Sequence, residues 1–225
     1  MTFSTAVHQQ AAHLWQQSFD HPFIKEMANG QLPIRKFRFY CIQDYRYLEI
    51  FNHLQRQVMD QLSAVYLIPR NLFEMDDSQL EIQERERYFQ EMSVSPEEYR
   101  DADLAPTNYD YLNHLRQSVA DSAEVGLAAL LPCPWLYNEL AEYWQDQHSP
   151  EPMYDHFFAT YAAVAASGEK QRMMAALDTV ADGVDQATQD RMQRAFMRSS
   201  FYELHFWQMA MEEQQWQEWN SLTGR

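Results

Sequence analysis

The sequence predicts an all-α fold in which a single helical domain covers residues 1–225. Apolar residues recur at intervals of three and four along most of the chain, which is the period of an amphipathic helix. No stretch alternates strictly enough between apolar and polar residues to predict a strand. The 225 residues include 13 Tyr, 13 Phe, 6 Trp and 12 Met but only 5 Gly, which is typical of helices packed through aromatic side chains.

The first predicted helices are bounded by proline and glycine. An amphipathic helix covers residues 5–19 and ends before His21-Pro22, because proline disfavours the helical conformation of the residue before it. Asn29-Gly30 is a helix stop, and Pro33 suits the first turn of a second helix that runs to about residue 62. Asp44 falls inside the apolar stripe of this second helix.

The rest of the chain is also predicted to form a series of helices. Residues 77–92 are rich in Glu and Arg and are predicted to be solvated along most of their surface. Ser95-Pro96 and Ala105-Pro106 each begin a further helix, the first with a capping serine. Helical patterns then cover residues 122–147, 153–161, 168–184 and 186–219.

A cysteine stands between two prolines in the run Leu130-Leu131-Pro132-Cys133-Pro134-Trp135-Leu136-Tyr137. Each proline removes a backbone donor and crowds the preceding turn, so the helix is predicted to bend or restart at this cysteine. Such a bend can turn a thiol into a cavity. The alternative is that Cys133 is a small buried apolar side chain, the commonest fate of a free cysteine. Cys41 and Cys133 are both expected to be thiols, because a disulfide scaffold carries more cysteines in a shorter chain.

Two carboxylates fall on otherwise apolar helix faces, where a charge is costly without a partner. Asp44 is three residues from both Cys41 and Tyr47 and therefore shares one side of the helix with them. Glu203 lies in a nearly apolar segment, where an unpaired carboxyl group tends toward the neutral form that a general acid needs. Each carboxylate could instead have a purely structural role. Asp44 could pair with a tyrosine or with Arg46, and Glu203 could be hydrogen-bonded to a tyrosine.

Charge and hydropathy exclude several classes of partner. The net charge is -16, with 17 Lys and Arg, which argues against binding a phosphate backbone. No window approaches the roughly 18 uninterrupted apolar residues that a membrane helix needs, and no apolar signal stretch follows Met1. We therefore expect a soluble cytoplasmic protein with neither a nucleic-acid nor a membrane partner.

Several segments stand in order along nearly the whole chain: His21-Pro22-Phe23, Gly30 to Pro33, Phe37 to Tyr40, Gln43 to Leu48, Leu130 to Tyr137, Tyr202-Glu203 and Phe206-Trp207. Together they resemble the TenA (thiaminase II) family, and the combination of QDYRYL with LLPCPWLY is the most specific part. The resemblance implies the helical fold shared with haem oxygenases, assembled as a homotetramer. It also implies hydrolysis of a small aminopyrimidine to the hydroxymethyl pyrimidine of thiamin salvage. No metal or organic cofactor is implied.

The resemblance also implies roles for individual residues. Cys133 would be the nucleophile that adds to the pyrimidine ring, which places the chain in the cysteine-bearing group of the family. Glu203 would be the acid and base for the leaving group and the water, and Asp44 would bind the ring nitrogen and amino group. The expected substrate-binding tyrosines are Tyr47, Tyr111 and Tyr161, with Tyr137 as a further candidate and Tyr202 as a hydrogen-bond partner of Glu203.

Some alternatives stay open within this family. The substrate is either thiamin or 4-amino-5-aminomethyl-2-methylpyrimidine, and we expect the aminomethyl compound. Tyr45 and Arg46 stand at variable positions and could tune this choice. The region from Leu67 to Asp103 resembles the family least, and its glutamates, including Glu81, are given no role.

Two further function classes are considered. Some haem-oxygenase-like proteins are oxidases that bind two iron ions, and Glu49 and His53 share a helix face, with Glu203 and His205 as further candidates. Residues two apart, such as Glu203 and His205, point away from each other on a helix, and a second Glu-x-x-His pair is missing. The third class is a helical regulator without catalysis.

Overall fold

Helices α1 to α11 form the structure, a computed structural model that describes residues 1–69, 75–165 and 168–217. No strand occurs within these ranges, which confirms the predicted all-α class. The helices are Phe3–Phe19 (α1), Pro22–Ala28 (α2), Ile34–Tyr66 (α3), Met75–Glu91 (α4), Pro96–Arg100 (α5), Pro106–Asp121 (α6), Ala123–Leu130 (α7), Pro132–Tyr143 (α8), Pro152–Ala165 (α9), Glu169–Asp182 (α10) and Gln186–Glu212 (α11).

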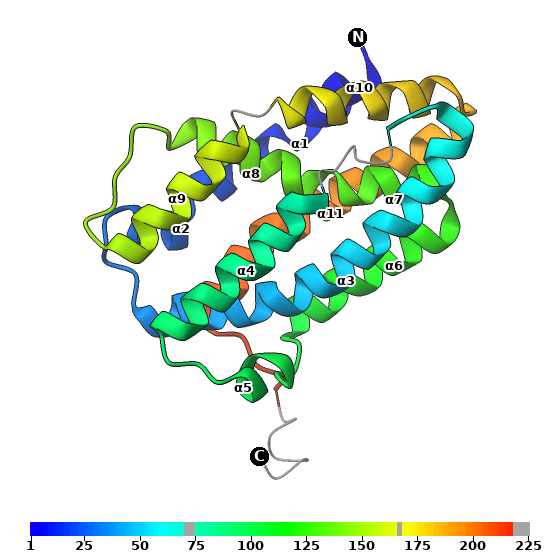
Figure 1. The fold of residues 1–225 in the computed structure, drawn as a ribbon. Coiled ribbons are helices and arrows are strands. Elements are labelled where there is room, and N and C mark those ends of the chain that lie inside the picture. Colours follow the sequence, from blue (N-terminus) through cyan, green and yellow to red (C-terminus); the bar gives the residue numbers. More distant parts are fainter. Residues whose placement is uncertain (70–74, 166–167, 218–225) are drawn as a thin grey trace.

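Helix α3 has 33 residues, and helices α4, α6 and α7 pack along it (Figure 1). Helix α11 packs against α7, α1, α6 and α8 and so connects both ends of the chain to the centre. Helices α8 and α9 form another packed pair. Helix α10 lies across the top of the view in Figure 1, close to the N-terminal helix α1.

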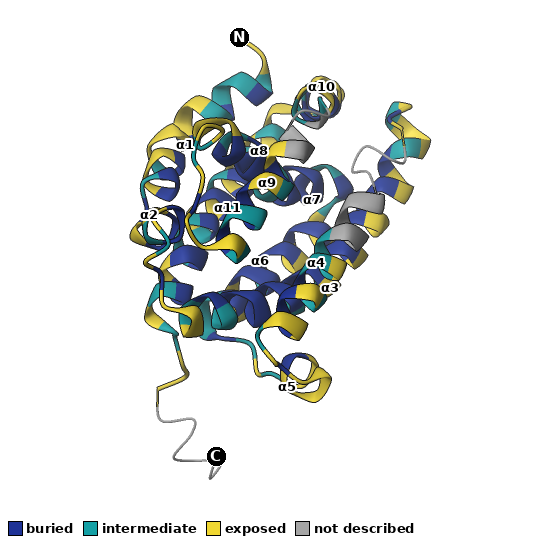
Figure 2. Cartoon of the chain, turned by 60° about the vertical axis from the view of Figure 1, so that its left-hand side comes forward, coloured by how far each residue is buried: buried dark blue, intermediate teal, exposed yellow. Residues whose placement is uncertain are grey.

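The core is most continuous on α6, α7 and α11, whereas α1, α2 and α5 turn exposed faces outward (Figure 2). Helix α7 is buried along most of its length and approaches α3 and α6 closely at Gly126. A Cβ atom at Gly126 would lie 2.9 Å from Cγ2 of Val58 and 3.1 Å from Cα of Val119. Only glycine therefore fits this crossing without a shift of the neighbouring helices.

Most helix starts lie within two residues of the predicted positions, whereas the ends of α3, α8, α9 and α11 differ from them by four residues or more. Helix α1 begins two residues before the predicted start because the Thr2 side chain caps it and accepts the N–H of Thr5. Helix α3 continues past residue 62 to Tyr66 and ends at Leu67, whose φ of 57° is left-handed. Helix α11 ends at Glu212, before the predicted residue 219, because Glu213 adopts a left-handed φ of 52°.

The predicted break at the cysteine is confirmed. Helix α7 ends at Leu130 and α8 begins at Pro132, so the two helices meet one residue before the first proline. Pro132 occupies the first position of α8, where the missing N–H costs no intrahelical bond. Cys133 consequently lies in the first turn of α8.

The Glu- and Arg-rich helix α4 has a buried face in its C-terminal half that the prediction of a mostly solvated helix did not include. Arg85, Tyr88 and Phe89 of α4 are at most 2% exposed. Tyr88 and Phe89 follow Arg85 by three and four residues, so the three side chains lie on one face of the helix. The many charged residues around them make this face hard to recognise from the sequence.

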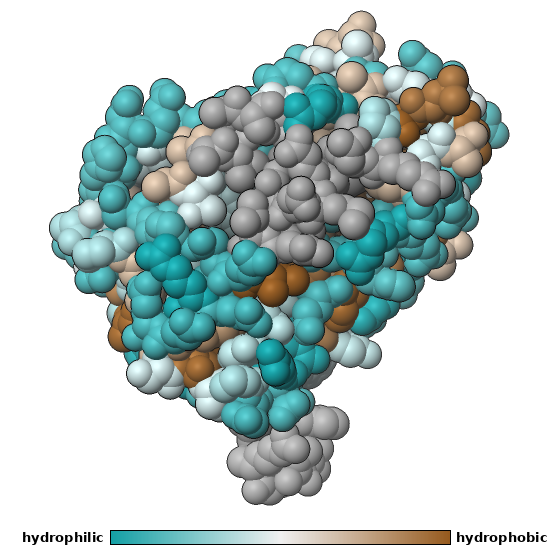
Figure 3. All heavy atoms as spheres, viewed as in Figure 1, coloured by the Kyte–Doolittle hydropathy of each residue, from teal (hydrophilic) through white to brown (hydrophobic). Residues whose placement is uncertain are grey.

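The outer surface is largely polar on the face shown in Figure 3, with only scattered apolar side chains between the hydrophilic ones (Figure 3). None of the helices in the described part of the chain is long and apolar enough to cross a membrane.

Candidate active site

The two cysteines have different environments. Cys41 is fully buried in the core on α3, whereas Cys133 is half-buried at the start of α8. Both are free thiols, as predicted from the cysteine count. Cys133 is therefore the thiol that a small molecule could reach.

The thiol of Cys133 is surrounded by carboxyl groups. Burial raises the pKa of Cys133 well above its ordinary value, and the charges of Glu203, Glu81 and Asp44 raise it further. The start of a helix favours an anion, whereas burial and these charges act in the opposite direction. In the resting site Cys133 is a protonated thiol, and a thiolate must be generated when it reacts.

Glu203 projects from α11 and is buried, with a 4% exposed residue surface. The hydroxyl of Tyr111 on α6 donates a hydrogen bond of 2.5 Å to its Oε1. Burial raises the pKa of Glu203 to about 8, and the charges of Asp44 and Glu81 act in the same direction against the Tyr111 hydrogen bond. The group is not unpaired, because the alternative of a hydrogen bond from a tyrosine is what the structure shows, but burial still raises its pKa, so the carboxyl group can gain or lose a proton near neutral pH.

Asp44 is buried on α3 and pairs with Arg85, an arginine within the Glu- and Arg-rich helix α4. Nε of Arg85 on α4 donates a 2.7 Å hydrogen bond to Oδ2 of Asp44. The alternative partner Arg46 is wrong, because Arg46 lies two residues along the helix and donates instead to the carbonyl oxygens of Arg100 and Ala102. Burial raises the pKa of Asp44, and the charge of Arg85 opposes this rise.

Arg85 also reaches two tyrosine hydroxyls. Its Nη2 donates to Tyr161 of α9 at 2.9 Å and to Tyr40 of α3 at 3.2 Å. The hydroxyls of Tyr40 and Tyr137 are in turn hydrogen-bonded at 3.0 Å. A network of hydrogen bonds thus links α3, α4, α8 and α9 around Asp44.

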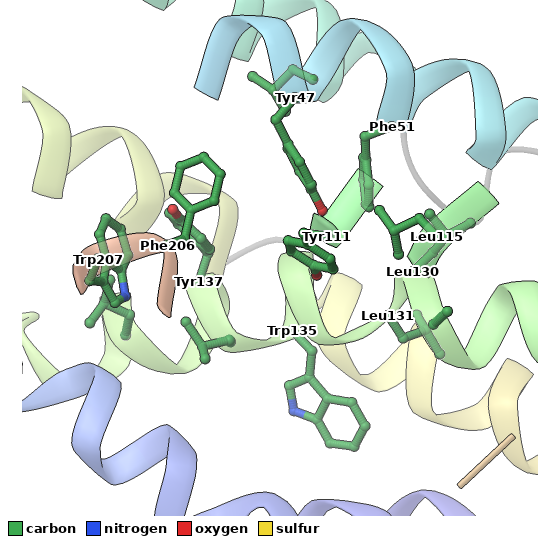
Figure 4. Packing of buried hydrophobic residues seen from close by; sticks show 14 of the residues in the cluster. Tyr47, Phe51, Tyr111, Leu115, Leu130, Leu131, Trp135, Tyr137, Phe206 and Trp207 are labelled. Carbon is green, nitrogen blue, oxygen red and sulfur yellow. The ribbon is translucent and has the colours of Figure 1, made fainter. Parts of the chain in front are cut away.

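Aromatic rings line the region around Cys133 and Glu203. Tyr47 points from α3 toward Tyr111, and their ring centroids are 5.2 Å apart (Figure 4). The Tyr47 hydroxyl is buried and lies close to both the Cys133 thiol and the Tyr111 hydroxyl, so that these groups affect one another's pKa. No described group completes a hydrogen bond of full geometry with this hydroxyl, so it has capacity to bind a ligand or water.

Two neighbouring aromatic residues lie outside this region. Trp135 extends from the opposite side of α8 toward α1 and packs against Trp15. Tyr202 is half-buried and stacks on the outer side of Tyr111, with ring centroids 5.1 Å apart. The hydrogen bond to Glu203 expected from Tyr202 is made by Tyr111 instead, because adjacent residues on a helix point in directions about 100° apart.

The structure therefore groups most of the residues singled out in the sequence. The tyrosine network and the mutual effects of the charged groups place them around one interior site: Asp44, Tyr47, Tyr111, Cys133, Tyr137, Tyr161 and Glu203. Arg85 is the addition, and Tyr202 supports the site only from behind Tyr111.

The geometry does not favour the di-iron alternative. Glu49 and His53 are exposed on α3, whereas Glu203 is buried on α11. Across the described ranges, no three His, Cys, Asp or Glu side chains are grouped so that they could hold a metal ion. The helix face that suggested an iron site in the sequence is turned to solvent.

Fold and site together define an all-helical protein with a half-buried thiol and two buried carboxyl groups between its helices. The family model described as TENA/THI-4/PQQC matches residues 8–213. The chain belongs to this family, and the resemblance seen in its motifs is confirmed.

Relatives with assigned names match along nearly the whole chain, and a solved structure shares its fold. A relative from Bacillus subtilis (strain 168), named aminopyrimidine aminohydrolase, is 31% identical over 219 residues, covering 96% of this chain and 92% of the relative. A protein of the same name from Halalkalibacterium halodurans is 26% identical and covers 96% of this chain and 98% of its own length. The structure of a TenA homologue from P. horikoshii OT3 matches with a TM-score of 0.82 at 24% identity, over 94% of this chain and 99% of that one.

Proposed function

We propose that this protein is an aminopyrimidine aminohydrolase of the thiaminase II type. The observation that carries the proposal is the grouping of the Cys133 thiol with Asp44 and with Glu203, whose pKa is about 8. The names of the Bacillus subtilis and Halalkalibacterium halodurans relatives support the same activity.

Binding of the pyrimidine follows from the shapes and charges of the side chains. A flat ring stacks favourably against tyrosine faces such as those of Tyr47 and Tyr111. Asp44 can accept a hydrogen bond from the amino group of the pyrimidine, and also from the adjacent ring nitrogen when that nitrogen is protonated; charge strengthens such hydrogen bonds. The ion pair with Arg85 uses Oδ2 of Asp44, so Oδ1 is not occupied by that contact.

The proposed reaction needs one group that moves a proton in both directions. Glu203 in its carboxylate form accepts the thiol proton while the sulfur of Cys133 bonds to a ring carbon. The resulting Glu203 carboxylic acid then protonates the leaving amine as its bond to the methylene carbon breaks. Because the pKa of Glu203 is about 8, both of its forms are accessible near neutral pH.

Water completes the reaction and restores the protein. Glu203 takes a proton from water as the oxygen bonds to the methylene carbon, and the bond from sulfur to the ring then breaks. The proton held by Glu203 returns to the thiol. Overall, the aminomethyl pyrimidine and one water give the hydroxymethyl pyrimidine and ammonia, and Cys133 acts as a covalent catalyst that is regenerated.

The preferred substrate, the assembly and the location are also proposals. We infer that 4-amino-5-aminomethyl-2-methylpyrimidine is preferred over thiamin, and that the chain acts in the cytoplasm as a homotetramer, as the family resemblance implies. Sedimentation velocity of the full chain tests the assembly, and a monomer at micromolar concentration would contradict it. The ratio of kcat/KM for the two substrates tests the preference, which a higher value for thiamin would overturn.

The deciding experiment measures release of the hydroxymethyl pyrimidine by the wild type, Cys133→Ser and Glu203→Gln. Glu203→Gln should lower kcat by about 10²–10⁴-fold, the usual contribution of a positioned acid and base. Cys133→Ser should lose at least as much, because a serine hydroxyl is a far weaker nucleophile at the same position.

The matched control is Glu212→Gln, which changes an exposed carboxylate on the same helix as Glu203 and should leave turnover unchanged. A wild-type protein without turnover of either substrate would refute the proposed function. Unimpaired Cys133→Ser and Glu203→Gln variants would refute the proposed roles.

A further inference from the structure

Arg85 is an unusual arginine because its side chain is only 2% exposed inside an acidic protein. Burying a guanidinium group is costly unless it is paired and its donors are hydrogen-bonded. Its carboxylate partner at 2.7 Å is Asp44. Aromatic rings surround its cationic face, with Cζ 5.5 Å from the ring centre of Tyr40 and 5.8 Å from that of Phe157.

The partners of Arg85 come from separate parts of the proposed site. It bonds Asp44 and Tyr40 on α3 and Tyr161 on α9, and Tyr40 extends the contact to Tyr137 on α8. Helix α8 also carries Cys133. The Arg85 side chain on α4 therefore connects Asp44 with the helices that carry the thiol and the tyrosines.

Stability alone is a weak reason for this arrangement. A buried ion pair often contributes no more stability than apolar side chains of the same volume, because desolvation of both charges offsets their attraction. What the pair does provide is a fixed geometry, because the planar guanidinium directs its N–H groups along set directions. Its hydrogen bonds hold the carboxylate and two hydroxyls at once.

We propose that Arg85 is a positioning residue of the aminopyrimidine site, which fixes Asp44 and Tyr161 in the orientation that receives the ring. This inference rests on the proposed function. Arg85 acts through its partners and touches no reacting atom. Its positive charge also opposes the effect of burial on Asp44, whose pKa would rise further without it.

The test compares the hydrolysis kinetics of Arg85→Met, Arg85→Lys, Asp44→Asn and the double variant Arg85→Met/Asp44→Asn. Arg85→Met should raise KM for the aminomethyl pyrimidine by about tenfold or more, with a smaller change in kcat, since ring binding is lost before the chemistry. Arg85→Lys keeps the charge but not the planar fork, and should raise KM by about three- to tenfold.

The effects of the single and double variants on KM distinguish a positioning role of Arg85 from a general loss of structure. If Arg85 acts through Asp44, the double variant should bind no more weakly than Asp44→Asn alone, because the group that Arg85 orients has already been neutralised. The matched control is Arg87→Met, which removes a half-exposed arginine two residues along the same helix and should leave KM unchanged.

Two results would overturn the inference in an active wild type: an Arg85→Met effect no larger than that of Arg87→Met, or effects of Arg85→Met and Asp44→Asn that multiply in the double variant. If Arg85→Met does not fold, Arg85→Lys decides, and an unchanged KM in that variant overturns the inference. A wild type without turnover points instead to failure of the proposed function.

Discussion

Glu203 links the chemistry of the site to the stability of the protein. Its pKa rises from 4.5 to about 8 on folding, mainly because burial disfavours the charged form. Between these two values the folded protein holds a proton that the unfolded chain releases. Stability from this group is therefore fully present below pH about 4.5 and is lost as the pH rises toward 8.

Glu203→Gln should remove this pH dependence. Glutamine has nearly the same shape and never ionises, so the melting temperature of the variant relative to the wild type should increase between pH 5 and pH 9. Thermal denaturation at matched ionic strength measures the difference, with the exposed Glu212→Gln as the control. A difference that is independent of pH would contradict the raised pKa of Glu203.

The sequence was informative about single residues where a polar side chain interrupts an apolar pattern. Asp44 and Glu203 stood out in this way, and Cys133 stood out between its prolines. Arg85 was missed because its neighbours are also charged, so nothing in the local composition marks it as buried. The available signal was its spacing from Tyr88 and Phe89, which predicts a shared face.

At the scale of the helix, the close packing of α7 against α3 and α6 depends on a glycine, which has no side chain. Helix α7 lies against α3 and α6 at Gly126, where a Cβ atom would lie 2.9 Å from Val58 Cγ2 and 3.1 Å from Val119 Cα. The methyl group of an alanine would force the helices apart, because a backbone atom of α6 cannot rotate away.

Gly126→Ala should therefore destabilise the protein by about 1–3 kcal/mol, the usual range for overpacking, although alanine favours the helix intrinsically. Urea denaturation measures the change. Val58→Ala relieves the closest of the three contacts, so the double variant should be less destabilised than the sum of the single variants. A Gly126→Ala protein as stable as the wild type would show that the crossing can relax.

Helix starts were easier to predict than helix ends. Serine caps and first-turn prolines mark the starts of α5 and α6 directly in the sequence. The ends of α3 and α11 were missed because Leu67 and Glu213 take the left-handed conformation there, and neither residue type favours it. Tertiary packing, rather than local preference, determines these ends.

For the molecule as a whole, charge is the dominant long-range feature. The chain carries 33 Asp and Glu against 17 Lys and Arg, and self-repulsion of this excess disfavours the compact state. Raising the salt concentration from about 0.01 M to 0.15 M shortens the Debye length from about 30 to 8 Å and screens this repulsion.

We therefore expect the melting temperature at pH 7 to rise by about 2–4 °C over this range, equivalent to about 1 kcal/mol for a chain of this length. Differential scanning calorimetry in dilute buffer measures the change, and sucrose at equal osmolality controls for effects other than screening. A fall in melting temperature with salt would mean that surface ion pairs outweigh the repulsion.

The two cysteines differ in burial, so chemical labelling of thiols can measure how many molecules in a preparation are intact. Cys41 is sealed inside the core, whereas Cys133 is half-buried at the proposed site, so a small alkylating reagent has one thiol within reach in each folded chain. Unfolded molecules also expose Cys41, so label on Cys133 without label on Cys41 reports the fraction of molecules with an intact fold. Specific activities from different preparations can be normalised to that fraction instead of to total mass.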